Sequence, residues 1–151
     1  MATEFDGRVR DGRGDDLPVL LGIWERSVRA THDFLTEADI RDLVPVVRDQ
    51  ALPAVRLLVA EGGDGKALGF LGLDGHRVEM LFVDPDRFGC GAGRALIDAA
   101  TALAGPRLDL DVNEQNPGAR GFYAALGFIE TGRSPLDGQG RAFPLIHLRR
   151  G

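Results

Sequence analysis

Three glycines at alternate positions, Gly89, Gly91 and Gly93, form the part of the chain best suited to binding chemistry. A β-branched and aromatic run, residues 78–83, precedes them, and a strong helical pattern begins at Arg94. A strand, a glycine turn and a helix in this order expose backbone N–H groups at a positive helix N-terminus, which suits an anion and most often a phosphate. Glycine lets such a ligand approach the backbone closely because no Cβ is in the way.

Two common phosphate motifs do not fit this turn. A dinucleotide-binding fingerprint would need a third glycine or alanine where Arg94 stands. A Walker A loop would need serine or threonine after a Gly-Lys pair, and Gly65-Lys66 is followed by Ala67. A glycine-rich strand-to-helix connection without any ligand remains an alternative for the loop taken alone.

A second motif follows at residues 112–128, where a strand end and Asn113 lead into the pattern A-x-x-F-Y-x-x-L-G-F. Together with the glycine loop, this block resembles the GNAT superfamily of N-acetyltransferases over residues 55–148. Residues 23–35 and 131–134 are also similar to a small bacterial YjaB-type subgroup. One departure is visible: Phe88 stands where such families usually carry Arg or Gln, and the arginine, Arg87, comes one position earlier.

The resemblance implies an α+β fold with a mixed, mostly antiparallel central sheet flanked by helices and with acyl-CoA in a V-shaped opening between central strands. It implies that the pyrophosphate binds the N–H groups of the glycine loop and that the preceding strand pairs with the pantetheine arm and polarises the thioester carbonyl. The cofactor-binding residues implied are Leu81, Phe82, Val83, Gly89, Cys90, Gly91, Ala92, Gly93, Arg94, Asn113 and Tyr123. A branched side chain at Gly91 is expected to block the cofactor while the helix start tolerates it.

The resemblance also implies that Tyr123 is the general acid and that Glu79 is the second candidate catalytic residue. Tyr123, the only tyrosine, has an ordinary pKa of about 10, so it can protonate a leaving thiolate at neutral pH. A half-buried tyrosine on an amphipathic helix is its structural alternative. Glu79 interrupts an apolar strand, where carboxylates are rare without a partner or a task. It could relay a proton from the substrate ammonium, or simply pair with Arg77.

The early segment of residues 24–35 mixes apolar and polar groups at a junction between two predicted helices, where GNAT acceptor sites are built. We therefore expect the amine substrate near Trp24, His32, Asp33 and Phe34, although a core role for Trp24 and a capping role at the junction explain the same residues. The three histidines have no i, i+4 pairing and no cysteine partner, so we expect no metal.

Composition narrows the class of protein. A length of 151 residues predicts one domain over residues 1–151, and Cys90, the single cysteine, fits a reducing, cytoplasmic setting. A net charge of −5 argues against nucleic acid as a partner, and the absence of a long apolar run argues against a membrane span. The acidic segment of residues 1–6 does not resemble a signal peptide. A homodimer is compatible with the sequence.

Periodicity and turn residues predict the order of elements. Asp15-Asp16 should cap the first helix, the Thr36–Asp39 capping box should begin the second, and Pro45 should kink or divide that second helix. The predicted strands are 5–10, 55–61, 67–73, 76–84, 107–112, 128–131 and 143–148. The glycine-loop helix should end at Gly105-Pro106, and a short helix should cover 117–126.

The resemblance to the GNAT superfamily implies an acetyl-CoA-dependent N-acetyltransferase that moves an acetyl group to a primary amine of a small molecule or peptide by direct attack. No metal cofactor is expected. The main alternative is a non-catalytic acyl-CoA-binding or sensor module that keeps the loop without the chemistry. A third alternative is a protein that binds a phosphate ligand unrelated to coenzyme A.

Overall fold

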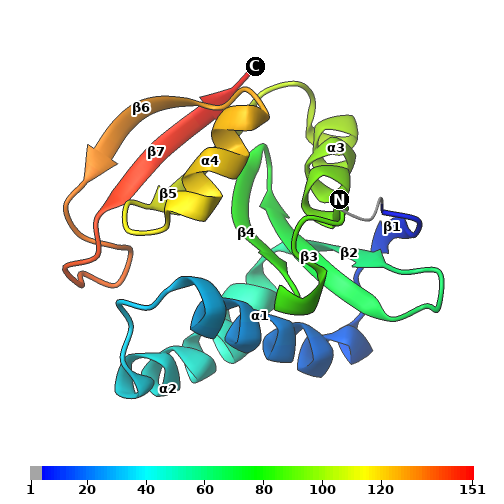
Figure 1. Cartoon of the computed structure of the whole chain (residues 1–151), viewed down its shortest axis with the longest axis horizontal. Coiled ribbons are helices and arrows are strands. Elements are labelled where there is room, and N and C mark those ends of the chain that lie inside the picture. The colour runs from blue at the N-terminus through cyan, green and yellow to red at the C-terminus, as the bar shows by residue number, and fades with distance from the viewer. Residues whose placement is uncertain (1–4) are drawn as a thin grey trace.

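A single seven-stranded sheet organises the chain (Figure 1). The computed structural model describes residues 5–151, so residues 1–4, which belong to the segment compared above with a signal peptide, lie outside the described part. The strand order is β1-β2-β3-β4-β5-β7-β6, and every neighbouring pair is antiparallel except β4 and β5. The strands are β1 Arg8–Asp11, β2 Arg56–Glu61, β3 Ala67–Asp74, β4 Arg77–Val83, β5 Leu108–Asn113, β6 Ile129–Ser134 and β7 Leu145–Arg150.

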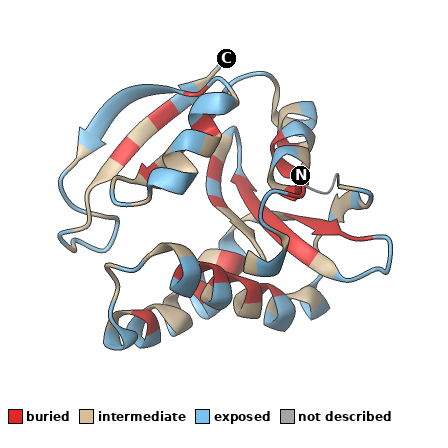
Figure 2. Ribbon diagram, viewed as in Figure 1, coloured by how far each residue is buried: buried red, intermediate tan, exposed pale blue. Residues whose placement is uncertain are grey.

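Helices cover both faces of the sheet, and the core is divided accordingly (Figures 1 and 2). On one face α1 (Leu17–Thr31) and α2 (Glu37–Val46) bury a cluster with Phe70 at its centre, and on the other α3 (Ala92–Ala104) and α4 (Pro117–Ala125) bury a larger one. Short helical turns complete the chain: η1 Gly14–Asp16, η2 Val47–Ala51, η3 Leu52–Ala54 and η4 Pro85–Arg87. The predicted mixed, mostly antiparallel sheet flanked by helices is confirmed.

The parallel pair at the centre of the sheet is very short. β4 and β5 pair only at Arg77 with Asp109 and at Val78 with Leu110. Beyond these two positions the strands separate, while β4 remains paired with β3 as far as Val83. One edge of β4 is therefore left without a strand partner over residues 79–83, and this opening holds the candidate site.

Several strand ends differ from the sequence prediction. β1 begins at Arg8 instead of residue 5, β6 extends three residues further to Ser134, and β7 is shifted by two residues to Leu145–Arg150. Strand ends are set by the partner rather than by local pattern. In β7, Arg149 and Arg150 pair with Asp109 and Leu108 of β5, so the ladder continues beyond the last apolar residue.

Of the predictions for the first two helices, only the cap of α1 is wrong. The Asp16 carboxylate makes no cap to α1, because it accepts bonds from the Arg10 guanidinium at 2.9 Å and the Arg13 N–H at 2.7 Å. The predicted box at Thr36 and Asp39 is confirmed by reciprocal hydrogen bonds of 3.1 and 2.9 Å. Pro45 divides the second helix as predicted: the α-helix ends at Val46, one residue after the proline, and the chain continues as the π-helical turn η2, an adjustment that can follow a missing backbone N–H.

None of the helices within residues 5–151 is long and apolar enough to cross a bilayer.

Candidate active site

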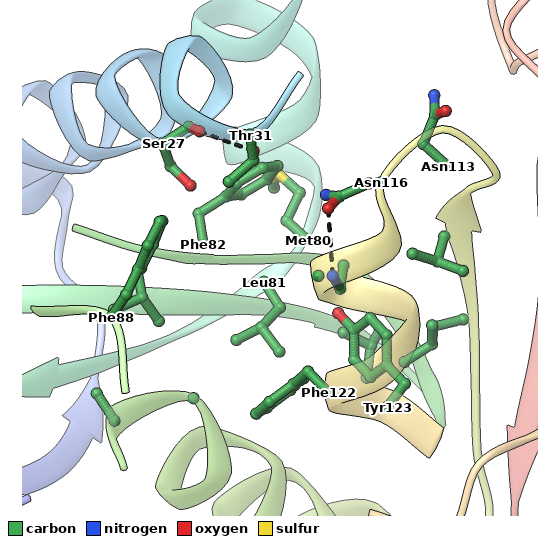
Figure 3. A pocket seen from close by; sticks show the side chains of 18 of the residues that line it. Ser27, Thr31, Met80, Leu81, Phe82, Phe88, Asn113, Asn116, Phe122 and Tyr123 are labelled. Carbon is green, nitrogen blue, oxygen red and sulfur yellow. Dashed lines mark hydrogen bonds between the residues drawn. The ribbon is translucent and has the colours of Figure 1, made fainter. Parts of the chain in front are cut away.

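A cavity of about 610 Å³ occupies the opening beside β4 (Figure 3). Its walls come from the end of α1, from β4 and β5, from the glycine loop with the start of α3, and from α4. The predicted site residues that line it are His32, Glu79, Leu81, Phe82, Val83, Gly89, Gly91, Ala92, Gly93, Arg94, Asn113 and Tyr123. Trp24, Asp33, Phe34 and Cys90 are not among its lining residues.

The glycine loop turns β4 into α3 through two left-handed residues, Gly89 (φ +79°) and Gly91 (φ +94°). Gly91 is the N-cap of α3, and its carbonyl accepts the first helical bond, from the Ala95 N–H at 3.0 Å. The N–H groups of the first turn therefore have no carbonyl partner within the helix. They point out of the helix N-terminus at the cavity wall, where an anion would satisfy them.

Cationic side chains stand beside this helix end. Arg87 and Arg94 both line the cavity, and neither takes part in an ion pair within the described structure. Arg26 of α1 instead holds Asp84, at the start of the loop, through a 2.6 Å bond. Arg87, which stands one position before the usual place of this arginine, therefore still lines the cavity. Phe88, which occupies that usual place, is 48% exposed at the cavity mouth.

Cys90 differs from its neighbours in the loop. Its side chain is 5% exposed and packs in the core beneath α3, and its N–H donates to the Arg87 carbonyl at 3.3 Å. Neither group is free for a ligand, so we omit Cys90 from the proposed cofactor contacts. The expectation that the loop tolerates a side chain at Gly91 is also wrong, because its φ is left-handed and a Cβ there would lie 3.3 Å from the Phe5 Cβ.

The free edge of β4 presents its backbone to the cavity at alternate residues. Asp84 N–H donates to Leu68 of β3 at 2.7 Å, which fixes the hydrogen-bonding phase of the antiparallel pair. By that alternation Phe82 and Met80 bond to β3, whereas the N–H and C=O groups of Leu81 and Val83 point toward the opening. An extended ligand can bond there as an added strand would.

Tyr123 lies on α4 with its ring buried and its hydroxyl directed into the cavity (Figure 3). The ring packs edge-on against Phe122 at 5.2 Å and Phe128 at 5.5 Å. No described residue hydrogen-bonds the Tyr123 hydroxyl. Every fully buried side-chain oxygen in the described structure has a hydrogen-bond partner, so the Tyr123 oxygen is not fully buried and is accessible from the cavity. Burial raises the pKa of Tyr123, which keeps the phenol protonated at neutral pH.

Glu79 lines the cavity and also pairs with Arg77, so both interpretations of this residue apply. Its Oε1 accepts from Arg77 Nε at 3.0 Å, and the same guanidinium donates to Asp111 Oδ2 on β5 at 2.7 Å. Glu79 and Asp111 are the first residues beyond the β4–β5 pairing, and both line the cavity. Two carboxylates thus share one guanidinium at the point where the strands separate.

The α1 side of the cavity contains only one of the four predicted substrate residues. His32 lines it together with Ser27 and Thr31, whose hydroxyl lies 2.7 Å from His32 Nδ1. Burial lowers the pKa of His32, so the imidazole is neutral at neutral pH. Trp24 is 5% exposed and belongs to the α1–α2 core, because its place on the helix faces the sheet.

The remaining two predicted substrate residues lie outside the cavity. Asp33 is exposed, and Phe34 packs between His32 and Phe143 with ring centroids 5.3 and 5.2 Å away. Phe34 therefore joins the α1–α2 junction to the β6–β7 loop. It packs beside the α1 end of the cavity without lining it.

Sequence reasoning missed Asn116, Phe122 and Asp111 as cavity residues. Asn116 caps α4 by accepting the Ala119 N–H at 3.2 Å, which an asparagine before a proline could have signalled. Phe122 lies against Gly93, where a Cβ would come within 3.1 Å of its ring. Asn113 lines the cavity, but its Oδ1 accepts the Gln115 N–H at 3.0 Å.

Comparison with known proteins agrees with this geometry. Residues 53–130 match the family model described as an acetyltransferase (GNAT) domain. The chain is 44% identical to the peptidyl-lysine N-acetyltransferase YjaB of Escherichia coli K12, over 93% of this chain and 94% of that protein. It is 35% identical to the peptidyl-lysine N-acetyltransferase YiaC of the same organism, over 80% and 82% of the two chains.

A solved structure gives the same relationship. The solution structure of apo-form YjaB from Escherichia coli superposes with a TM-score of 0.87 at 41% identity, covering 95% of this chain and 97% of that one. The similarity to the YjaB-type subgroup expected from residues 23–35 and 131–134 is thereby confirmed. The chain belongs to the GNAT family of acetyltransferases and is an acyltransferase of the N-acetyltransferase class.

Proposed function

We propose that this acetyltransferase uses acetyl-CoA to acetylate a primary amine, namely the side chain of lysine in a peptide or protein. One observation carries the proposal: a single cavity joins an unpaired helix N-terminus, a free strand edge and the Tyr123 hydroxyl. These are the parts needed for a phosphate group, an extended amide-bearing arm and a thiolate leaving group. The lysine acceptor is supported by the names of the relatives, YjaB and YiaC.

The residues of the loop suit the phosphate end of the cofactor. The N–H groups of Ala92, Gly93 and Arg94 would bind the pyrophosphate, and the guanidinium groups of Arg87 and Arg94 would add charge-assisted contacts. From there the free edge of β4 leads toward Tyr123. The backbone of Val83 and Leu81 would bond the pantetheine amides, which places the thioester near the Leu81 N–H.

The chemistry follows from the groups at that end of the cavity. Glu79 attracts the acceptor ammonium and draws away its proton, directly or through water. The neutral amine then attacks the thioester carbonyl, whose developing oxyanion the Leu81 N–H stabilises. Tyr123, whose phenol is protonated at neutral pH, donates its proton to the sulfur as the C–S bond breaks, and the phenolate then recovers a proton from the positively charged nitrogen of the product, directly or through water.

Thermal stabilisation by acetyl-CoA tests the cofactor assignment. At about a hundred times its Kd the ligand should add roughly 2.7 kcal/mol, which raises the Tm of a domain of this size by about 5–10 °C. NAD and ATP serve as controls, since they carry phosphates but no pantetheine arm, and should give much smaller shifts. Equal shifts with ATP would mean that the loop binds phosphates generally and that the assignment of coenzyme A is wrong.

A further inference from the structure

Two segments that are far apart in the sequence touch beside the α1 end of the cavity. The connection between β6 and β7, residues 135–144, lies next to the junction of α1 and α2 (Figure 1). Phe143 of the connection packs against Phe34 of the junction, with ring centroids 5.2 Å apart. Arg141 Nη1 donates to Oδ1 of Asp39, in the first turn of α2, at 3.1 Å. We call these two contacts the clasp.

Both sides of the clasp are held in place by hydrogen bonds of their own. On α2, the second carboxylate oxygen of Asp39 accepts the Thr36 N–H at 2.9 Å in the capping box. In the β6–β7 connection, the Asp137 carboxylate accepts the N–H groups of Gln139 at 2.9 Å and Arg141 at 2.8 Å. The clasp therefore joins two preorganised segments, and little conformational entropy is lost when they meet.

The clasp completes a ring of contacts around the opening between β4 and β5. From His32, which lines the cavity, the ring passes through Phe34 and Phe143 to Pro144, whose carbonyl accepts the Glu114 N–H at 2.9 Å. It then follows β5 back to its pairing with β4, and β4 packs against α1, which ends next to His32. An amine that reaches the opening from the α1–α2 face of the sheet must therefore pass through this ring.

The two sides of the ring differ in chemistry. On the strand side, the carboxylates of Glu79 and Asp111 share the single guanidinium of Arg77, so the net charge there is negative and suits an ammonium group. On the clasp side, Phe34 and Phe143 are only half-buried, so their rings keep apolar surface that can cover an alkyl chain. A lysine side chain has both parts, an ammonium at the end of an apolar stem.

A closed ring also distinguishes amines by what surrounds the nitrogen. The ε-amine of lysine ends an unbranched four-carbon chain, whereas the α-amine of a peptide stands on a carbon that also carries a side chain and the main chain. We propose that the clasp selects lysine side chains over peptide α-amines by closing the outer side of the acceptor passage. This inference rests on the proposed function, because it requires an amine acceptor at the Glu79 end of the cavity.

The test compares two peptides of the same sequence. One has a blocked N-terminus and a single lysine, and the other has a free N-terminus and norleucine in place of that lysine. The wild type should have the higher kcat/KM for the lysine peptide. In Phe143→Ala the ratio of kcat/KM for the lysine peptide to that for the α-amine peptide should fall by about 10-fold, because loss of the ring opens the passage to the bulkier surroundings of an α-amine. The Kd for acetyl-CoA should stay unchanged, since Phe143 does not line the cavity.

Two further variants test the clasp from its other parts. Phe34→Ala removes the same ring contact from the opposite side, so it should lower the ratio by a similar factor, and it provides a second test if Phe143→Ala does not fold. The double variant should change the ratio little beyond either single variant, because all three lack one shared contact. Arg141→Gln removes only the ion pair with Asp39, and its effect should be smaller because both groups are partly exposed.

Leu136→Ala is the matched control. Leu136 is an apolar residue of the same β6–β7 connection, but it is 48% exposed and takes no part in the clasp. This variant should keep the wild-type ratio. The Tm of each variant would show that it remains folded.

The outcomes separate the two proposals. An unchanged ratio in folded Phe143→Ala and Phe34→Ala would overturn the role of the clasp while leaving the proposed function intact. A wild type that acetylates the α-amine peptide as efficiently as the lysine peptide would overturn it as well. A wild type that acetylates neither peptide would instead refute the proposed function.

Discussion

Replacing Tyr123 with phenylalanine should lower kcat by about 10²–10⁴ while changing the affinity for acetyl-CoA by no more than a few-fold. The variant removes one oxygen that faces the cavity and keeps the ring, whose contacts with Phe122 and Phe128 hold α4 against the sheet. Its Tm should therefore remain close to that of the wild type. Single-turnover and steady-state rates, with acetyl-CoA binding measured separately, would check this prediction.

The buried position of Tyr123 also determines the pH dependence. Because burial raises its pKa above the ordinary value of 10, the phenol stays protonated throughout the usual assay range. No ionisation of Tyr123 should be visible in the rate profile near neutrality. If kcat survives in the phenylalanine variant, the thiolate leaves without this acid and the proposed role of Tyr123 is wrong.

The second large effect is expected at Arg94, where two substitutions separate backbone from side chain. Arg94→Ala removes the guanidinium and keeps the N–H, whereas Arg94→Pro removes both. Arg94 lies exposed in the first turn of α3, where proline is tolerated because this N–H has no helical partner. Alanine should weaken acetyl-CoA binding a few-fold, and proline should weaken it by about a further 10- to 100-fold, as expected for a charge-assisted hydrogen bond.

Calorimetric titration of both variants would measure this difference, with circular dichroism and Tm as the control for helix α3. Equal affinities in well-folded Arg94→Ala and Arg94→Pro would show that the N–H contributes nothing to cofactor binding. This pair replaces the simpler substitution of Gly91, whose left-handed φ makes loss of binding inseparable from backbone strain.

Local signals in the sequence were sufficient to predict the order and type of most helices and strands. Turn glycines and caps place the hairpins and helices, and the Thr36–Asp39 box and Gly105 mark ends that the structure confirms. Pairing between strands is not a local property, and this explains the shifted ends of β6 and β7. The failed prediction of a helix cap at Asp16 has the same cause, because its carboxylate accepts a hydrogen bond from Arg10, which lies on β1.

The candidate site divides in the same way. Residues fixed by a motif, such as Tyr123 and the loop glycines, reach the cavity as expected. Residues whose direction depends on packing do not: Trp24 turns into the α1–α2 core, and Cys90 turns beneath α3. His147 of β7 hydrogen-bonds both Asp111 of β5, 36 residues earlier, and Ser134 of β6, because the strand order places β7 between β5 and β6, and no local pattern specifies that order.

Mass-spectrometric analysis of a lysine peptide incubated with acetyl-CoA and the wild-type enzyme tests the central claim most directly. The account predicts an acetyl group on the lysine side chain, an equal amount of released coenzyme A, and no acetylated enzyme intermediate, because the amine attacks the thioester directly. A protein that binds acetyl-CoA and is stabilised by it, yet transfers no acetyl group to lysine or to any other amine, would contradict the account and would be a non-catalytic acyl-CoA-binding module.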